Sequence, residues 1–239
     1  MEEPTAKDTK VKTRIRELLA FYKNEFHRSR GEEWANGITH MIGAVFGIVA
    51  LTLMVVFASI KGNAWHITSC SIYGATLVML NFSSTMYHLA KNFAAKRIWQ
   101  YFDHCTIYFL IAGSYTPFTL VTLRGPCGWT IFGIVWGLTL LGVLLEVTLP
   151  PKYIMYTSLP IYVIQGWLIV TAFKSIMANL PTTGLVMLVV GGVVYTLGII
   201  FYIMDKTPYM HTIWHLFVLG GNVCHWVCIT FYVIPWGEE

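Results

Sequence analysis

Three histidines and one aspartate carry the chemistry that this sequence suggests: His88, Asp103, His211 and His215. His211 and His215 are four residues apart, so on a helix both imidazoles lie on one face and can clamp one metal ion. Counting of the apolar segments places all four residues at the same depth of a membrane. A lone histidine at a helix end is ordinarily a hydrogen-bonded structural residue. Four costly ionisable groups at one depth indicate a shared site.

The composition of this site favours zinc. Three neutral imidazoles suit Zn²⁺ better than Ca²⁺ or Mg²⁺, which prefer more oxygen ligands. We expect His88, His211 and His215 to bind the ion, with Asp103 close enough to hold a bound water. Catalytic zinc keeps such an open position and lowers the pKa of its water to about 7, so that Asp103 would serve as a base or orient the water. Ser84, one turn before His88, either binds substrate or packs between helices.

A second polar group begins the first apolar segment. Glu33, Asn36 and His40 are spaced three and four residues apart, on one helical face at the same inner depth. They are expected to support the site behind the metal ligands. The alternative is a capped and solvated helix start. Asn222 and His225 continue the face of the histidine pair into the outer half of its helix, where they are candidates to line a cavity.

Two further ionisable groups lie near the inner side and are not assigned to the site. His104 follows Asp103 and points about a third of a turn away from it. Glu146 lies near the inner end of its apolar segment, and we expect it to pair with Lys152.

The elements that must position these residues are membrane-spanning helices. The chain has 239 residues, of which 56% are hydrophobic and 12% charged. Continuous apolar runs of spanning length predict a single seven-helix transmembrane bundle, all-α in class, and argue against a β-barrel with its alternating pattern. The predicted spans are 38–60, 66–90, 100–123, 128–149, 153–173, 183–204 and 209–234.

The basic residues orient this bundle. Lys7, Lys10, Lys12, Arg14, Arg16, Lys23, Arg28, Arg30, Lys91, Lys96, Arg97, Lys152 and Lys206 fall on one side, and Lys61, Arg124 and Lys174 fall on the other. By the positive-inside rule the N-terminus is cytoplasmic and the C-terminus is outside, opposite to a G-protein-coupled receptor. Residues 1–31 are then a basic cytoplasmic segment, and residues 32–239 form the membrane domain.

The basic segment is expected to set topology rather than bind nucleic acid. Its apolar residues recur at helical spacing, which predicts a short amphipathic helix on the inner leaflet. These residues are Val11, Ile15, Leu18, Tyr22 and Phe26. The five cysteines are odd in number and lack CxxC spacing, which argues against a disulfide framework, and we assign them no chemistry.

At the candidate site the sequence resembles the haemolysin III-like proteins of the progestin and adipoQ receptor superfamily. The matching segments are EEWANGITH at 32–40, STMYH at 84–88 with FDH at 102–104, LIAGSYTPF at 110–118 and HTIWH at 211–215, continued by LFVLG to residue 220. The resemblance covers nearly the whole chain from about residue 32 and keeps the order of the motifs. The short loops are typical of bacterial members, which implies a multi-pass protein of the bacterial inner membrane.

The resemblance implies a seven-helix bundle with a cytoplasmic N-terminus and zinc held by His88, His211 and His215, with Asp103 contacting the zinc directly or through water. It also implies a link to lipids, because the wider superfamily includes ceramide-cleaving amidases and receptors connected with ceramide hydrolysis and membrane-lipid homeostasis. Bacterial members carry the haemolysin name for reported cytolytic activity.

Three functional hypotheses follow. In the first, the protein is a zinc-dependent hydrolase of a lipid amide or ester at the inner leaflet. In the second, zinc is structural and the protein senses or regulates the state of the membrane without turnover. In the third, the protein is a pore-forming cytolysin, which the sequence supports poorly because no span shows the polar stripe of a wide channel.

Overall fold

The computed structural model describes residue 13 and residues 28–235, and in this part of the chain all regular structure is helical. The long helices are α2 (Arg30–Lys61), α3 (Ala64–Leu89), α4 (Phe93–Pro117), α5 (Pro126–Thr148), α6 (Pro151–Trp167), α8 (Thr182–Ile203) and α9 (Met210–Cys228). Shorter segments extend or connect them: η1 (Phe118–Thr122), η2 (Leu168–Ala172), α7 (Phe173–Asn179) and η3 (Ile229–Val233). The predicted amphipathic helix within residues 1–31 lies almost wholly outside the described residues.

Six of these helical segments are long and apolar enough to cross a membrane, which confirms an all-α membrane protein. The exception is α3, although its 26 residues match the others in length. Twelve of its residues are buried, including Asn81, Ser83 and Ser84. Since α3 packs between α2 and α4, it meets less lipid and can carry more polar side chains. The structure is therefore consistent with the predicted count of seven spans.

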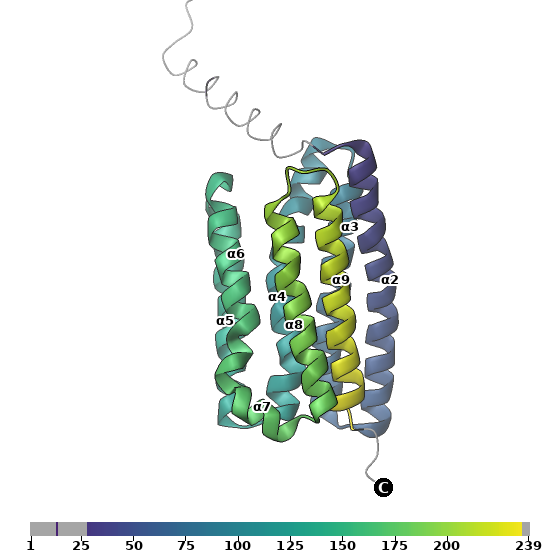
Figure 1. The fold of residues 1–239 in the computed structure, drawn as a ribbon, viewed down its shortest axis with the longest axis vertical. Helices are drawn as coiled ribbons and strands as arrows, with labels where there is room; N and C mark the ends of the chain where they lie inside the picture. The colour runs from purple at the N-terminus through teal and green to yellow at the C-terminus, as the bar shows by residue number, and fades with distance from the viewer. Residues whose placement is uncertain (1–12, 14–27, 236–239) are drawn as a thin grey trace, which may run out of the picture.

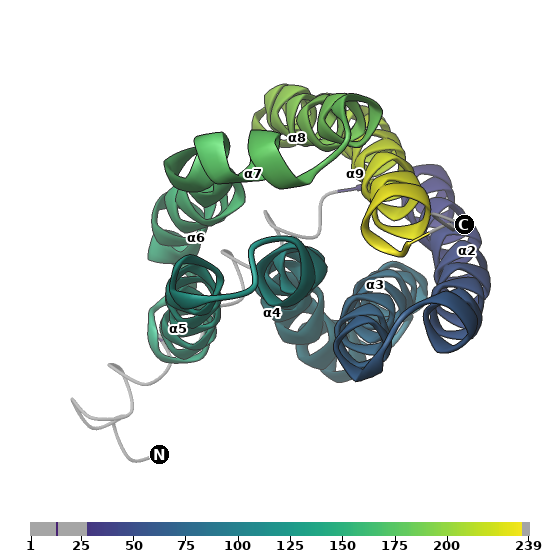
Figure 2. The same ribbon diagram turned by 90° about the horizontal axis from the view of Figure 1, so that it is seen from below.

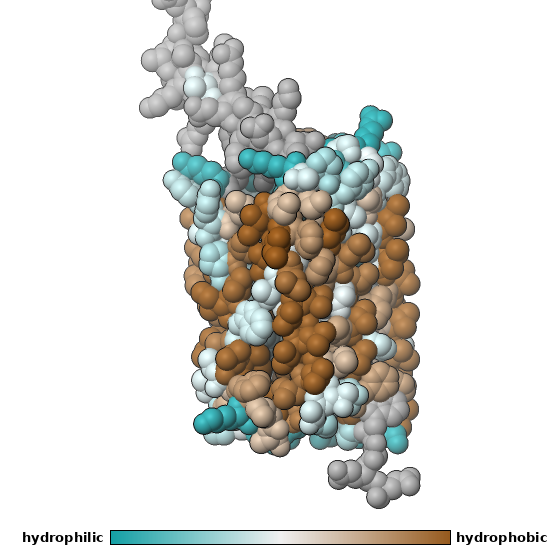
Figure 3. All heavy atoms as spheres, viewed as in Figure 1, coloured by the Kyte–Doolittle hydropathy of each residue, from teal (hydrophilic) through white to brown (hydrophobic). Residues whose placement is uncertain are grey.

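The helices are arranged in a ring. Each long helix contacts its neighbours along the chain, and α9 closes the ring by packing against α2 (Figure 2). The Arg30 end of α2 and the Val233 end of η3 lie at opposite ends of the bundle (Figure 1). A broad apolar band crosses the middle of the face seen in Figure 3, with polar residues above and below it. This is the surface pattern of a bundle in lipid.

Polar capping residues determine where α2 and α4 begin. Ser29 and Glu32 form a capping box, so α2 begins at Arg30 rather than at the predicted residue 38. Asn92 accepts hydrogen bonds from the backbone N–H groups of Ala94 and Ala95 and starts α4 at Phe93, before the predicted residue 100. The hydropathy pattern marks only the part of a helix that lies in hydrocarbon. These two helices therefore begin about two turns before the predicted spans.

A glycine allows α4 and α5 to approach each other closely. A Cβ atom added to Gly142 of α5 would lie 2.3 Å from the Tyr108 ring of α4. Tyr108 is fully buried. By contrast, a Cβ atom added to Gly137 of the same helix would meet no atom within 4 Å. Close contact between small residues and large neighbours is how membrane helices pack without a hydrophobic driving force.

We predict that Gly142→Ala destabilises the bundle, because the added methyl group forces the Tyr108 ring out of its place. Overpacking of this kind costs about 1–3 kcal/mol. The measurement is the apparent melting midpoint of the detergent-purified protein. Gly137→Ala is the matched control and should leave the midpoint unchanged or slightly raise it, since alanine favours helix. Equal midpoints for the two variants would contradict this packing.

Candidate metal centre

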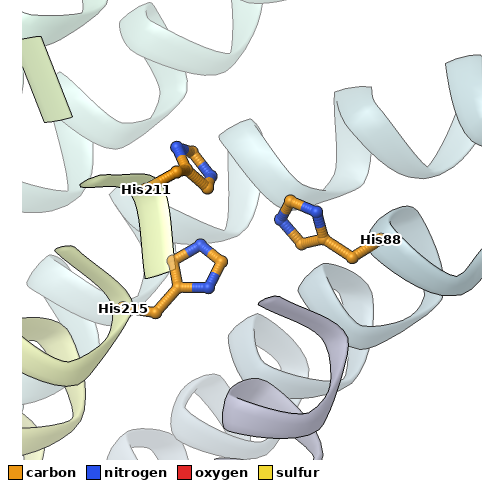
Figure 4. Close-up of side chains that lie close together, drawn as sticks. All are labelled: His88, His211 and His215. Carbon is orange, nitrogen blue, oxygen red and sulfur yellow. The ribbon is translucent and has the colours of Figure 1, made fainter. Parts of the chain in front are cut away.

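Three histidines from two helices converge inside the bundle. His88 comes from the last turn of α3, and His211 and His215 come from the first two turns of α9. One nitrogen from each ring lies within 4.8 Å of the others, and all three residues are buried. Figure 4 shows the three rings facing a common point. Two nitrogens on one tetrahedral zinc ion lie about 3.4 Å apart, so small rotations of the rings would suit such an ion.

The Nδ1 atom of each ring faces an oxygen. His88 Nδ1 lies 2.8 Å from the Glu33 carboxylate, and His211 Nδ1 lies 2.9 Å from the Asp205 carboxylate. His215 Nδ1 lies 3.4 Å from the Thr39 hydroxyl. The Thr39 hydroxyl donates its own hydrogen to the carbonyl groups of Ala35 and Asn36, so its oxygen is available to accept from His215.

These contacts favour one tautomer. A neutral imidazole with an acceptor at Nδ1 carries its proton there, and its Nε2 then offers a lone pair. The Nε2 atoms of His88, His211 and His215 are all buried and have no hydrogen-bond partner among the described residues. Burying an unsatisfied polar atom is costly, and three such acceptors in one place need a common partner. A metal ion satisfies all three, and carboxylates behind metal-binding histidines are the usual support.

Asp103 and Ser84 lie beside the three histidines rather than among them. Both are buried, and the Ser84 hydroxyl lies beside the Asp103 carboxylate. Among the described residues, the group of atoms close enough to share one ion contains only the three imidazoles. Asp103 instead lines an internal cavity together with His40. This position suits a contact with the metal through water or substrate.

The face of α2 predicted to support the site lies against it. Besides Glu33, Asn36 accepts a hydrogen bond of 2.5 Å from the Thr212 hydroxyl, next to His211. His40 pairs with Asn81 at 2.9 Å, and its ring packs edge-on against His215 at 4.1 Å between centroids. The structure therefore brings this part of α2 together with α3 and α9. A solvated helix start would leave Asn36 and His40 exposed, whereas both are buried.

Two residues of the site, Arg28 and Asp205, were not predicted from the sequence. Arg28 pairs with Asp205, and its guanidinium also lies 3.1 Å from His211 Nδ1. Burial alone would raise the pKa of Asp205, but the hydrogen bond from His211 and the charge of Arg28 hold this pKa well below its usual range. The available signal was the position of Asp205 in the short loop only six residues before His211. In the sequence, Arg28 was counted only among the basic residues that orient the bundle.

Glu146 makes different contacts from those we expected. It accepts from Ser158 at 2.9 Å and pairs with His104 at 2.7 Å, rather than pairing with Lys152. His104 thus turns toward α5 and away from the three histidines, in line with its predicted exclusion from the metal ligands. Because Glu146 is buried, it pairs with residues of the packed helices rather than with Lys152 at the helix end.

An apolar cavity of about 150 Å³ adjoins the centre. His40 and Asp103 are polar residues on the side of the histidines, and most of the walls are aliphatic and aromatic side chains from α3, α4, α6, α8 and α9. Trp214, between the two histidines of α9, is also part of the wall. Three buried imidazoles beside an apolar cavity suit a polar group that is carried by an otherwise apolar molecule.

The fold and this site define a class: a multi-pass helical membrane protein with a buried three-histidine centre near one end of the bundle. Residues 28–226 match the family model described as haemolysin-III related. This chain belongs to the haemolysin-III related family.

The relatives agree with this assignment. The chain is 42% identical to Hemolysin-3 of Bacillus cereus over 204 residues, covering 85% of this chain and 93% of that protein. It is 41% identical to the Hemolysin-3 homolog of Bacillus subtilis (strain 168) over 203 residues, covering 85% and 95%. It is 30% identical to the human monocyte to macrophage differentiation factor over 211 residues, covering 84% of each chain. The bacterial relatives fit a location in the plasma membrane.

We predict that Glu33→Gln weakens metal binding about 10- to 100-fold, because the amide accepts the His88 Nδ1 proton less strongly than a carboxylate. The measurement is titration of the metal-stripped protein with Co²⁺ and Zn²⁺. Glu32→Gln is the matched control, since Glu32 contacts Ser29 and the backbone of Tyr209 rather than a histidine. Parallel losses in both variants would contradict a specific role for Glu33.

Proposed function

We propose that this protein binds zinc through His88, His211 and His215 and hydrolyses a lipid amide or ester at the inner leaflet, as part of membrane-lipid homeostasis. The observation that carries the proposal is the set of three buried, unpartnered Nε2 atoms beside an apolar cavity that contains Asp103. Three imidazoles leave a coordination position free, which is typical of catalytic zinc. A site buried at one end of a membrane bundle suits a lipid better than a soluble substrate.

In this proposal each residue of the site has a separate chemical role. Zinc bound there would polarise the substrate carbonyl and make water a nucleophile at neutral pH. Glu33 and Asp205 keep the rings of His88 and His211 in the metal-binding tautomer. Asp103 takes a proton from the attacking water and passes it to the leaving amine or alcohol as the C–N or C–O bond breaks. Ser84 fixes the carboxylate of Asp103, and the cavity holds the hydrocarbon chain.

We predict that Asp103→Asn removes turnover while most of the zinc stays bound. The amide keeps the shape of the side chain but cannot take up a proton. The measurements are metal analysis of the purified protein and untargeted lipidomics of cells with wild-type or variant protein. General acid–base catalysis contributes about 10²- to 10⁴-fold, and the loss should fall in that range. Loss of zinc from the Asp103→Asn variant, or a wild-type protein that alters no lipid, would contradict the proposal.

The matched comparison for the structural-zinc hypothesis is His88→Ala. A second role for zinc is favoured by the way the centre joins α2, α3 and α9 through Glu33, Thr39 and the three histidines. If zinc only holds these helices together in a sensor of membrane state, His88→Ala lowers the melting midpoint and the function in parallel and no lipid is consumed.

Liposome leakage that persists after replacement of His211 and His215 would instead support the cytolytic activity that the name of the Bacillus cereus relative suggests.

We predict that Gly192→Leu reduces turnover of a long-chain lipid but not of a short-chain analogue with the same amide or ester. Gly192 lines the cavity, and an added Cβ atom would meet only Trp167 at 4.0 Å, so a larger side chain fits and fills the space. The measurement is kcat/KM for both substrates. Gly133→Leu on α5 is the control, because its Cβ atom meets nothing within 4 Å and it lines neither cavity.

A further inference from the structure

Two cavities meet in the half of the bundle away from the three histidines. The cavity beside the metal centre adjoins a second one of about 220 Å³, whose walls come from α4, η1, α6, η2, α7, α8 and α9. Both cavities are lined by Ser114, Tyr115, Gly166, Trp167, Gly192 and His225. His225 is ten residues beyond His215 on α9, which places it about 15 Å along the helix axis from the metal centre. The junction is therefore well separated from the residues assigned to zinc and catalysis.

His225 is the polar side chain at this junction that the protein leaves unsatisfied. Both of its ring nitrogens are inaccessible to solvent, and neither makes a hydrogen bond of normal geometry with a described residue. The backbone of Leu188 lies on one side of the ring and offers it a carbonyl acceptor. A neutral imidazole that directs its one N–H toward Leu188 presents its other nitrogen as an acceptor. Such an acceptor, buried without a donor, is costly.

The other polar groups at the junction have partners. The Ser114 hydroxyl donates to the Ile111 carbonyl at 2.8 Å. The Tyr115 hydroxyl donates to the Gly166 carbonyl at 2.7 Å and accepts from the backbone N–H of Ile169 at 2.9 Å. These groups have little capacity left to satisfy His225.

The charge of the cavity walls limits what can bind there. Asp103 is the one charged residue that lines either cavity in the described part of the chain, and it lies at the metal end. A charged group at the junction would have no counter-ion and would pay a large desolvation cost. The ligand group that fits His225 is therefore an uncharged hydrogen-bond donor, such as a hydroxyl, carried by an otherwise apolar molecule.

We propose that His225 is a recognition residue for an uncharged hydroxyl on a hydrocarbon chain that occupies the two cavities. The ligand is a hydroxyl-bearing alkyl or acyl chain, and the hydroxyl donates to the imidazole about 15 Å from the three-histidine centre. The observation behind this is the buried acceptor at the junction of two apolar cavities. The inference concerns binding and does not require that the protein hydrolyse a lipid.

The test compares straight-chain alcohols with α,ω-diols of the same length, about 10 to 14 carbons to match the 15 Å span. Each competes with a fluorescent fatty alcohol for the full-length protein in lipid nanodiscs. Neither probe has a bond that can be hydrolysed, so the result is independent of turnover. With a partner at His225, at least one diol should bind about 3- to 10-fold more tightly than its alcohol, the value of one hydrogen bond. Without a partner, the buried second hydroxyl makes the diol the weaker ligand.

The variant His225→Phe keeps an aromatic ring but removes the acceptor. We expect it to bind the alcohol as the wild type does and to lose the preference for the diol. His66→Phe is the control and should keep the preference, because His66 lines neither cavity. A wild-type protein without any preference for a diol overturns the proposal, whether or not the variant folds, and so does a preference that survives in His225→Phe. A diol preference in a protein that turns over no lipid would support this proposal while refuting the hydrolase.

Discussion

The contact on which the site depends is the one between each imidazole Nδ1 and an oxygen behind it. Glu33 and Asp205 are carboxylates, and they fix the protons of His88 and His211 on the side away from the centre. The Nε2 lone pairs then face one another in an interior of low polarity, where nothing else in the described chain satisfies them. A tautomer is thus selected by residues on α2 and on the α8–α9 loop, far in sequence from α3. The centre is a property of the assembled bundle rather than of the HTIWH motif.

This dependence explains the unusual composition of α3. Asn81, Ser84 and His88 follow one another at helical spacing and contact His40, Asp103 and Glu33, respectively. A helix with so many polar groups is unstable in contact with lipid, but α3 lies between α2 and α4 and exposes less of its surface. The polar side chains of α3 are therefore ones that its neighbours shield from lipid. The apolar helices α6 and α8 contribute cavity walls instead, and α5, α6 and α8 all contribute lipid-facing surface.

Much of this architecture follows from sequence, because hydropathy and the cost of buried charge act locally. The apolar runs predicted the membrane helices, and helical spacing predicted that His211 and His215 share a face. Other features depend on contacts across the chain. The pairing of Arg28 with Asp205 and of Glu146 with His104 joins residues 177 and 42 positions apart, respectively, and spacing within one helix holds no information about such pairs. The early start of α2 depends on a cap at Ser29, which a hydropathy window does not detect.

The length of α2 indicates how deep the residues of the site lie in the bilayer. Its exposed aliphatic side chains run from Ile38 to Ile60, a rise of about 33 Å, close to the roughly 30 Å of bilayer hydrocarbon. The turns before Ile38, which carry Glu33 and Asn36, then extend among the headgroups, and His40 marks the edge of the hydrocarbon. His88 contacts Glu33 and His215 packs against His40, so the three-histidine cluster lies at that same edge. At this level a phospholipid or sphingolipid presents the ester or amide that joins its tails to its polar end. In the proposed hydrolase, that linkage would reach the three histidines without leaving its own layer.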